Sequence, residues 1–412
     1  MKQIQYRNNL FILFNSILDR VIFFLLYLFL ARTAPKSEYG FIATIFAFTN
    51  ILQAIFDLGL PFYIQREVAI GNDISKKINS IFYVKIISLI LYVPIPLIYF
   101  AIKADSDLAL VLIISLINFC WGMSAIFNSI MYGYNSYKQS AYYLFLSRLV
   151  LIISFSIIFL IAPSIENILL SFLISFLVHS IFFVYYLKRS GIKLPKEKFD
   201  STLIRKILSS SILMGVGVIF VLIYDRSDVI ILQRISGLES VAFYSAAYSI
   251  YRSAQVFGTM IIIPKYSSLA RSFSINKRLV ANELKNILYS LSLIGFTVIL
   301  ILFFFSTHII KFLFSADYIY SASILKYLSF GFAGVLMNNF TGVILNSIKK
   351  EKIPAITTGL GAAINIILNI ILISKFGVWG AVITTIVTEY LVFIFQLIML
   401  IYYKMKKIFV LG

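Results

Sequence analysis

Long runs of apolar residues alternate with short polar stretches along the whole chain. A membrane-spanning helix needs about 20 mostly apolar residues, and twelve runs meet that requirement. Short segments containing proline or glycine, such as PKSEYG and KFGVWG, separate the runs and predict the connections. We expect helices at residues 8–31, 39–63, 79–102, 107–132, 140–162, 166–187, 207–233, 240–263, 287–310, 320–347, 354–374 and 378–403. The pattern predicts an all-α, polytopic membrane protein with about 12 transmembrane helices.

The composition supports this interpretation. Apolar residues make up 60% of the 412 residues and charged residues 13%, whereas soluble domains are roughly 45–50% apolar and about 25% charged. Cys120 is the single cysteine, which excludes an internal disulfide framework and a cysteine-rich metal site. The first apolar run is too long for a signal-peptide core and lacks a small-residue cleavage site, so we expect it to remain in the mature protein.

The basic residues indicate how the chain is oriented. With a cytoplasmic N-terminus, 24 of the 36 Lys and Arg residues fall in inner segments and 6 in outer loops. Short cytoplasmic loops are rich in Lys and Arg, so both termini are predicted to be cytoplasmic. The net charge of +19 is then explained by topology and anionic lipid headgroups, and we expect no nucleic-acid partner.

Two halves of similar design are indicated along the chain. The longest cytoplasmic loop predicts an N-terminal six-helix bundle at 1–190, a basic linker at 191–206 and a C-terminal six-helix bundle at 207–412. The dipeptide Asp-Arg occurs in the first helix and again 206 residues later in the seventh. Together with looser matches downstream, this favours parallel repeats, which are common in transporters.

Several charged residues fall within the predicted spans. They are Asp19 and Arg20 in the first helix, Arg148 in the fifth, Asp225, Arg226 and Asp228 in the seventh, Arg252 in the eighth and Glu389 in the twelfth. A charge at the bilayer centre costs at least about 2.5–3.5 kcal/mol, so such residues are usually functional. Buried ion pairing is one explanation. A water-filled cavity between the halves is the other, and its arginines would bind an anion such as phosphate.

Glu389 and three further residues have structural alternatives. We expect Lys85 to extend its ammonium group to the headgroups and His179 to make a polar contact between helices. Asp57 serves either as a local pairing and helix-ending residue or as part of a functional site. Glu389 either pairs with a neighbouring cation or carries a coupling ion, and Asp19, Asp225 and Asp228 are candidates for the same two roles.

Motifs for enzymatic chemistry are absent from the sequence. It contains no Walker loop, no HExxH zinc motif and no nucleophile elbow. We therefore expect no enzymatic activity, no catalytic residue, no cofactor and no resident metal.

Three segments resemble a known family. They are NSILDR in the first helix, EYGFIATIFAFTNILQAIFDLGLPFYIQRE at 38–67 and YDRSDVIILQRISGLESVAFYSAAYSIYRSAQ at 224–255. With the twelve-helix pattern, they resemble the multidrug/oligosaccharidyl-lipid/polysaccharide (MOP) flippase superfamily, and within it the Wzx-type flippases of O-antigen or polysaccharide repeat units. The resemblance covers nearly the whole chain, although its motifs are loose.

That resemblance implies a MATE-like fold and alternating access with a cationic central cavity. Its cavity cations would correspond to Arg20, Arg252, Arg148 and Arg226. It also implies a polyprenyl-pyrophosphate-linked oligosaccharide as substrate, the bacterial cytoplasmic (inner) membrane as location, and a polysaccharide polymerase and chain-length regulator as candidate partners.

Two alternatives stay open at this point. The first is an ion-coupled multidrug or metabolite exporter of the same fold, and the second is a membrane polysaccharide polymerase. The coupling ion, H⁺ or Na⁺, is not indicated by the sequence.

Overall fold

The structure is a computed structural model that describes residues 2–71, 74–102, 107–192, 200–262, 265, 269, 277–348, 350 and 352–402. Within these ranges every regular element is a helix. The predicted all-α class is therefore confirmed.

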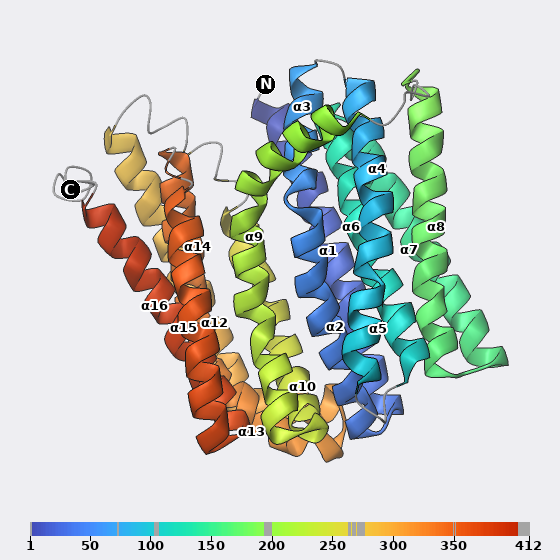
Figure 1. Cartoon of the computed structure of the whole chain (residues 1–412). Helices are drawn as coiled ribbons and strands as arrows, with labels where there is room; N and C mark the ends of the chain where they lie inside the picture. The colour runs from blue at the N-terminus through green and yellow to red at the C-terminus, as the bar shows by residue number, and fades with distance from the viewer. Residues whose placement is uncertain are drawn as a thin grey trace. The chain divides into compact units, whose positions relative to one another are not determined.

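Helices follow one another along the described residues (Figure 1). Their bounds are α1 Lys2–Thr33, α2 Lys36–Asp57, α3 Leu60–Ile70, α4 Ile74–Tyr92, α5 Pro94–Ala101, α6 Leu108–Gly133, α7 Tyr137–Ile161, α8 Ile165–Arg189, α9 Ser201–Ser236, α10 Leu238–Ala254, α12 Lys277–Leu313, the 3-10 turn η1 Ala316–Tyr318, α13 Ile319–Leu328, α14 Gly331–Ser347, α15 Lys352–Phe376 and α16 Val378–Tyr402. Residues 256–262, after α10, are also helical.

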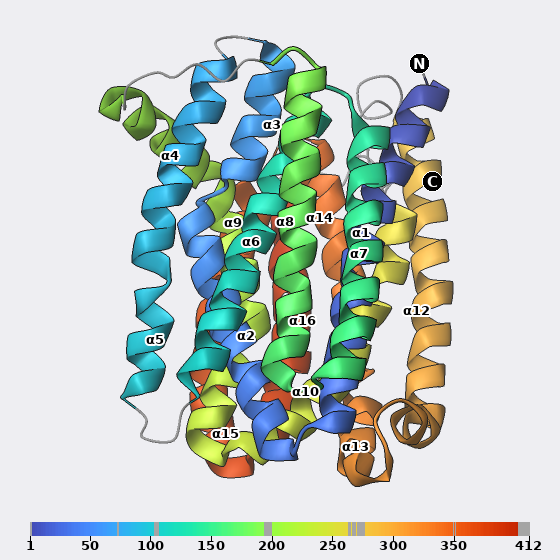
Figure 2. The same cartoon turned by 90° about the vertical axis from the view of Figure 1, so that its right-hand side faces the viewer.

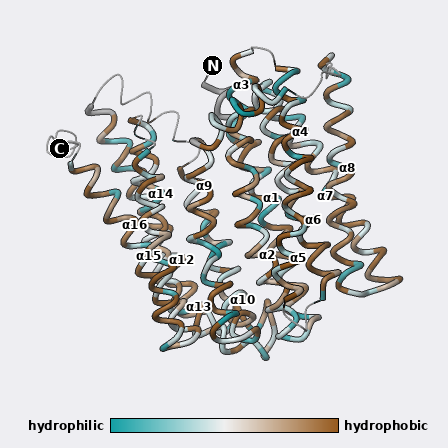
Figure 3. The backbone as a smooth tube through the Cα atoms, in the orientation of Figure 1, coloured by the Kyte–Doolittle hydropathy of each residue, from teal (hydrophilic) through white to brown (hydrophobic). Residues whose placement is uncertain are grey.

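Hydrophobic residues cover most of the length of these helices (Figure 3). Among the described residues, nine helical segments are long and apolar enough to cross a membrane, and two bent helix pairs raise the number to eleven. The segment expected at 240–263 is not among the eleven. Its helix α10 has 17 residues and contains Glu239 and Arg252, and it is shorter than each of the other spans. The chain is a multi-pass membrane protein.

Several expected spans are interrupted. The helix expected at 39–63 is broken after Asp57, because Leu58 and Gly59 both have positive φ angles, 47° and 75°. Glycine is required at the second position, since a Cβ atom on Gly59 would lie 2.5 Å from the backbone nitrogen of Gly215. The span expected at 79–102 is divided at Pro94, where α5 begins.

The helices form two compact units. The first unit comprises Met1–Thr44 and Ile223–Gly412, and the second comprises Ile45–Leu222. In the first, α15 and α14 both pack against α16, and α1 packs against α10. The expected division at 190 and 207 stays a prediction, as does the cytoplasmic location of both termini. Residues 193–199 of the expected linker lie outside the described residues.

The second unit has a continuous apolar core. There α6 packs against α3 and α8, and α7 packs against α8 (Figure 2). Phe127 of α6 stacks on Phe183 of α8 with ring centroids 4.2 Å apart. Ile64, Ile81 and Ile130 are fully or almost fully buried around this pair. Aromatic pairs of this kind contribute about 0.5–1.5 kcal/mol beyond the burial of their surface.

Candidate functional site: a charged cluster on α9 and α10

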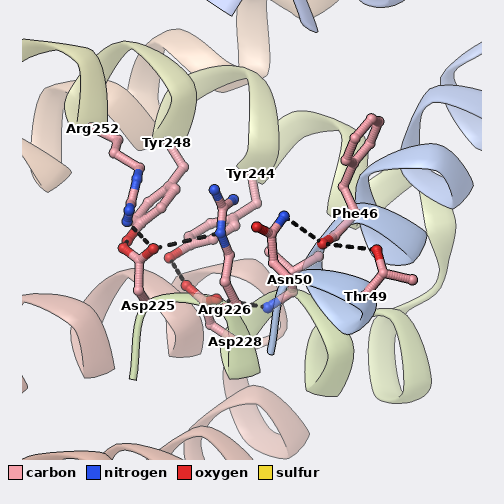
Figure 4. A network of polar contacts seen from close by, with 10 residues as sticks. Phe46, Thr49, Asn50, Asp225, Arg226, Asp228, Tyr244, Tyr248 and Arg252 are labelled. Carbon is pink, nitrogen blue, oxygen red and sulfur yellow. Dashed lines mark hydrogen bonds and ion pairs between the residues drawn. The ribbon is translucent and has the colours of Figure 1, made fainter. Parts of the chain in front are cut away.

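The charged residues of α9 face a row of polar side chains on α10. Tyr244, Tyr248 and Arg252 are spaced four residues apart, so they lie on one face of α10. In Figure 4 these three side chains extend from α10 toward Asp225 and Asp228 on α9. All five residues belong to the first compact unit.

Asp225 is the centre of the cluster. Its carboxylate accepts a hydrogen bond of 2.6 Å from the Tyr248 hydroxyl and forms an ion pair with the Arg252 guanidinium. The Nε atom of Arg226 lies 3.5 Å from the same carboxylate. Two guanidinium groups therefore face the single carboxylate of Asp225. The exposed fraction is 6% for the Asp225 side chain and 34% for that of Arg252.

Arg252 lies near the C-terminal end of α10. It belongs to the last turn of α10, which ends at Ala254, and the helix resumes at residue 256. The partial negative charge at a helix C-terminus favours a cation at this position. Both the helix end and Asp225 therefore stabilise the guanidinium.

Arg20 joins the same cluster from α1, which packs against α10. Its side chain is exposed, and it lies close enough to Arg252 for the two positive charges to repel each other. Tyr27, on the same helix, lies within the fields of both Arg226 and Arg252. Asp19 is half-buried beside Arg20 and has an interaction partner of its own. Three of the four predicted cavity cations are therefore in one region of the first unit.

Asp228 has a different environment from Asp225. It accepts hydrogen bonds from its neighbour's backbone, the Val229 N–H at 2.8 Å, and from the Tyr244 hydroxyl. That hydroxyl lies 3.0 Å from the Thr385 hydroxyl. These direct partners are neutral, so the negative charge of Asp228 is not cancelled by contact with a cation.

Glu389, on α16, is likewise held by neutral groups. The side-chain amide of Asn338 donates to its carboxylate at 2.7 Å and to its backbone carbonyl at 3.0 Å. Gly334 makes this approach possible, because a Cβ atom there would lie 2.8 Å from that of Glu389. Arg252 acts on Glu389 through its charge. Glu389 is therefore connected electrostatically to the cluster and hydrogen-bonded to Asn338.

A chain of amide and hydroxyl groups continues from the cluster into α15 and α16. Asn365 accepts from Ser227 at 3.1 Å and from Asn369 at 2.9 Å, and it donates to Thr388 at 3.4 Å. The sequence interpretation missed these residues. The signal was available, since two asparagines four residues apart in an apolar span must satisfy their amides on one helix face.

The fourth predicted cation, Arg148, belongs to the second compact unit. Its guanidinium donates to Ser175 at 2.9 Å and lies 4.8 Å from the centre of the Phe176 ring. Nearby, His179 Nδ1 and Ser124 Oγ are 2.7 Å apart, which confirms the expected contact between helices. Arg148 is buried, and its role as a substrate-binding cation stays a prediction.

The second unit also contains a buried ion pair. Lys85 Nζ lies 2.6 Å from the Asp57 carboxylate and 4.5 Å from the centre of the Phe119 ring. The prediction that Lys85 extends to the headgroups is wrong, because Asp57 provides a partner within the protein and the lysine side chain is 1% exposed. Asp57 also ends α2, so both parts of the structural expectation for this residue are met.

The described residues do not meet the requirements of a metal site. Among the described residues, no group of three or more His, Cys, Asp and Glu side chains is arranged to hold a metal ion.

Comparison with known proteins identifies the family. The profile of the polysaccharide biosynthesis protein family matches residues 6–264, and that of the MatE family matches residues 214–371. The chain is 32% identical over 286 residues to an uncharacterized membrane protein of Methanocaldococcus jannaschii. That match covers 66% of this chain and 55% of the relative, so the chain spans about half the length of the curated relative.

Solved structures share the fold. The inward closed conformation of the lipid II flippase MurJ is similar with a TM-score of 0.72 and 18% identity, over 94% of this chain and 87% of that one. An inward-facing multidrug resistance MATE family transporter of the MOP superfamily is similar with a TM-score of 0.68 and 15% identity, over 95% and 93% of the two chains. The fold is that of MOP transporters and flippases, and the chain belongs to the polysaccharide biosynthesis protein family.

Proposed function

We propose that this protein moves a polyprenyl-pyrophosphate-linked oligosaccharide, an O-antigen or capsule repeat unit, from the inner to the outer leaflet of the bacterial cytoplasmic membrane. The observation that carries the proposal is the excess of guanidinium groups around Asp225. The family match supports a role in polysaccharide assembly. A polymerase and a chain-length regulator remain the partners expected for such a role.

The arginines suit the pyrophosphate of this substrate. A guanidinium presents parallel N–H donors that match two phosphate oxygens. Arg252 keeps 34% of its side chain exposed while paired with Asp225, and Arg20 is exposed. Both therefore have donors available for a ligand. In this proposal the glycan follows the pyrophosphate through a water-accessible, cationic cavity by alternating access, while the lipid tail stays in the bilayer.

Two carboxylates are suited to a coupling ion. Asp225 is neutralised by Arg252 and Arg226, whereas the hydrogen-bond partners of Asp228 and Glu389 are neutral. A proton or a sodium ion bound at Asp228 or Glu389 would neutralise a buried charge and so favour one conformation. Asp228→Asn and Glu389→Gln are then expected to abolish the dependence of transport on an ion gradient, with exchange at equal ion concentrations retained.

An ion-coupled exporter is the second candidate. The MatE profile covers residues 214–371, which include the α9 and α10 cluster. A cationic compound would be repelled by the arginines and would use Asp228 and Glu389 instead. The two candidates therefore differ in the sign of the substrate's charge.

Transport in proteoliposomes tests the proposal. The purified chain is incorporated with a fluorescent polyprenyl-pyrophosphate-linked sugar, and accessibility of the sugar to an external lectin is followed. We expect flipping by the wild type and strongly reduced flipping by Arg252→Gln. The matched control is Arg234→Gln, which removes an exposed arginine of α9 outside the cluster. Equal rates for Arg252→Gln and Arg234→Gln would contradict the anion site.

A deletion in the native host separates the candidates. Loss of surface polysaccharide, with complete lipid-linked repeat units accumulating on the cytoplasmic side, supports the flippase. Single unpolymerised repeats on the surface would indicate a polymerase. Normal polysaccharide with altered sensitivity to toxic compounds would indicate the exporter.

A further inference from the structure

A groove lies between α7 and α8 in the second compact unit. It has a volume of about 620 Å³. Its lining residues are Lys138, Gln139, Tyr142, Tyr143, Leu146, Ile181, Phe182, Tyr185 and Arg189. The basic residues are at one end of the groove and the aliphatic residues at the other. The groove is therefore complementary to a lipid, which has a polar head and an apolar tail.

The two cations lie at the same end of the helix pair. Lys138 is the second residue of α7, and Arg189 is the last residue of α8. Each helix has 25 residues, about 37 Å at 1.5 Å per residue, which exceeds the hydrocarbon core of about 30 Å. Lys138 and Arg189 are therefore at the level of the headgroups. Within the described part of the chain, neither is ion-paired with a carboxylate.

Aromatic rings form the walls of the groove below the cations. Tyr143 stacks on Phe182 with centroids 5.4 Å apart, and Tyr185 meets Tyr143 edge-on at 6.5 Å. Tyrosines at this depth are typical of the membrane interface, where an apolar ring and a polar hydroxyl are both accommodated. The stacked pair fixes the width of the groove.

Exposed apolar side chains extend the groove toward the middle of the membrane. Ile181 and Leu177 of α8 are 65% and 63% exposed, and Ile152 and Ile153 of α7 are 50% and 58% exposed. A surface of this kind on a membrane-spanning helix pair packs against acyl chains. The occupant that matches the whole feature has a negatively charged head and a hydrocarbon tail.

We propose that this groove binds an anionic phospholipid of the adjacent leaflet, with its phosphate between Lys138 and Arg189 and an acyl chain along Leu146 and Ile181. Charge complementarity selects an anionic headgroup over a zwitterionic one. Lys and Arg side chains near the membrane surface attract anionic headgroups, so the two cations together give a preference of roughly tenfold or more. The inference is independent of the proposed function.

Native mass spectrometry of the purified full chain tests the site. Phosphatidylglycerol and phosphatidylcholine with identical acyl chains are titrated into detergent-solubilised protein, and the bound fractions are compared. We expect the wild type to prefer phosphatidylglycerol about tenfold. The double variant Lys138→Gln, Arg189→Gln should lose that preference, and Leu146→Trp should weaken the binding of both lipids by filling the groove.

Lys188→Gln is the matched control, because Lys188 precedes Arg189 on α8 and does not line the groove. It should bind phosphatidylglycerol as the wild type does. Thermal unfolding of each variant in the same detergent shows whether it is folded. A wild type without preference, or a folded double variant that binds as the control does, would overturn the proposal.

Two competitors distinguish other sources of phosphate. Inorganic phosphate and a short-chain polyprenyl pyrophosphate are each added to the phosphatidylglycerol complex. Retention of the phospholipid against both supports the proposal. Displacement by inorganic phosphate at equal concentration would assign the groove to a free anion. Preferential binding of the polyprenyl pyrophosphate would make it a substrate site.

Discussion

The two compact units bury charge within the membrane in different ways. In the second unit, Lys85 pairs one-to-one with Asp57 and is almost completely enclosed. In the first, Asp225 is shared by two arginines, and Arg252 remains one-third exposed. A balanced, enclosed pair has no charge left for a ligand, whereas an unbalanced, accessible cluster has. The balance and the exposure of charges, rather than their presence, therefore separate a structural pair from a candidate site.

Breaking the balanced pair should have the largest effect on stability. Lys85→Met leaves Asp57 without its partner, and we expect the free energy of unfolding to fall by about 3 kcal/mol. The double variant Lys85→Met, Asp57→Leu removes both charges and should recover most of that loss. Thermal unfolding in detergent measures both. If the double variant is as unstable as the single variant, the loss of stability does not come from an unpaired charge on Asp57.

Removing a cation from the unbalanced cluster should affect transport more than stability. If the proposed substrate is correct, Arg252→Gln deletes charge-assisted hydrogen bonds to its pyrophosphate, each contributing about 1.5–3 kcal/mol, which corresponds to a roughly 10- to 100-fold loss. Asp225 keeps Arg226 as a partner, so the fold should persist. Lectin accessibility in proteoliposomes gives the rate, with Arg234→Gln as the control. If Arg252→Gln transports at the wild-type rate but unfolds at a lower temperature, Arg252 has a structural role, as Lys85 and Asp57 do.

Crowding the enclosed pair without changing its charge sharpens the comparison. A Cβ atom on Gly122 would overlap the Gln53 amide and lie 2.8 Å from Asp57 Oδ2. Gly122→Ala should therefore lower the free energy of unfolding by about 1–2 kcal/mol through overpacking, with transport per folded molecule unchanged. Unfolding curves and transport rates on the same preparation provide the check. Slower transport at unaltered stability would contradict a structural role.

The smallest expected effect comes from a single hydroxyl in the cluster. Tyr248→Phe removes the 2.6 Å hydrogen bond to Asp225 and keeps the ring. We expect substrate affinity to weaken about fivefold, equivalent to about 1 kcal/mol for one hydrogen bond, with no change in the maximal rate. Initial rates over a range of substrate concentrations separate the two quantities. Tyr244→Phe, which removes a hydrogen bond to Asp228 instead, should leave affinity unaltered.

The sequence predicted the spans better than it predicted their interruptions. Apolar runs locate α1, α6 or α16 because hydrophobicity is a property of each segment by itself. No proline or glycine lies next to the end of α10 at Ala254, so the sequence does not predict that the helix ends there. The break at Leu58 depends on the close approach of Gly59 and Gly215, 156 residues apart in sequence.

The sequence indicated the charged residues of the candidate site, but it did not indicate which of them contact one another. Arg20, Asp225, Arg226 and Arg252 stand out as charges in apolar runs, but the pairing of Arg252 with Asp225 depends on how α9 meets α10. For the same reason the partner of Lys85 was missed, since Asp57 is 28 positions away. Asn365 and Asn369 carry no charge, so a search for ionisable residues passes over them.

The contact between Gly59 and Gly215 has a consequence for mutational scanning. Each backbone occupies the space where the other residue's first side-chain carbon would be, so neither position accommodates even a methyl group. A library of random substitutions selected for function should be depleted at these two positions as severely as at Arg252. Intolerance to substitution alone would therefore not distinguish a packing contact from a binding residue. Only abundance measured beside activity, variant by variant, would tell them apart.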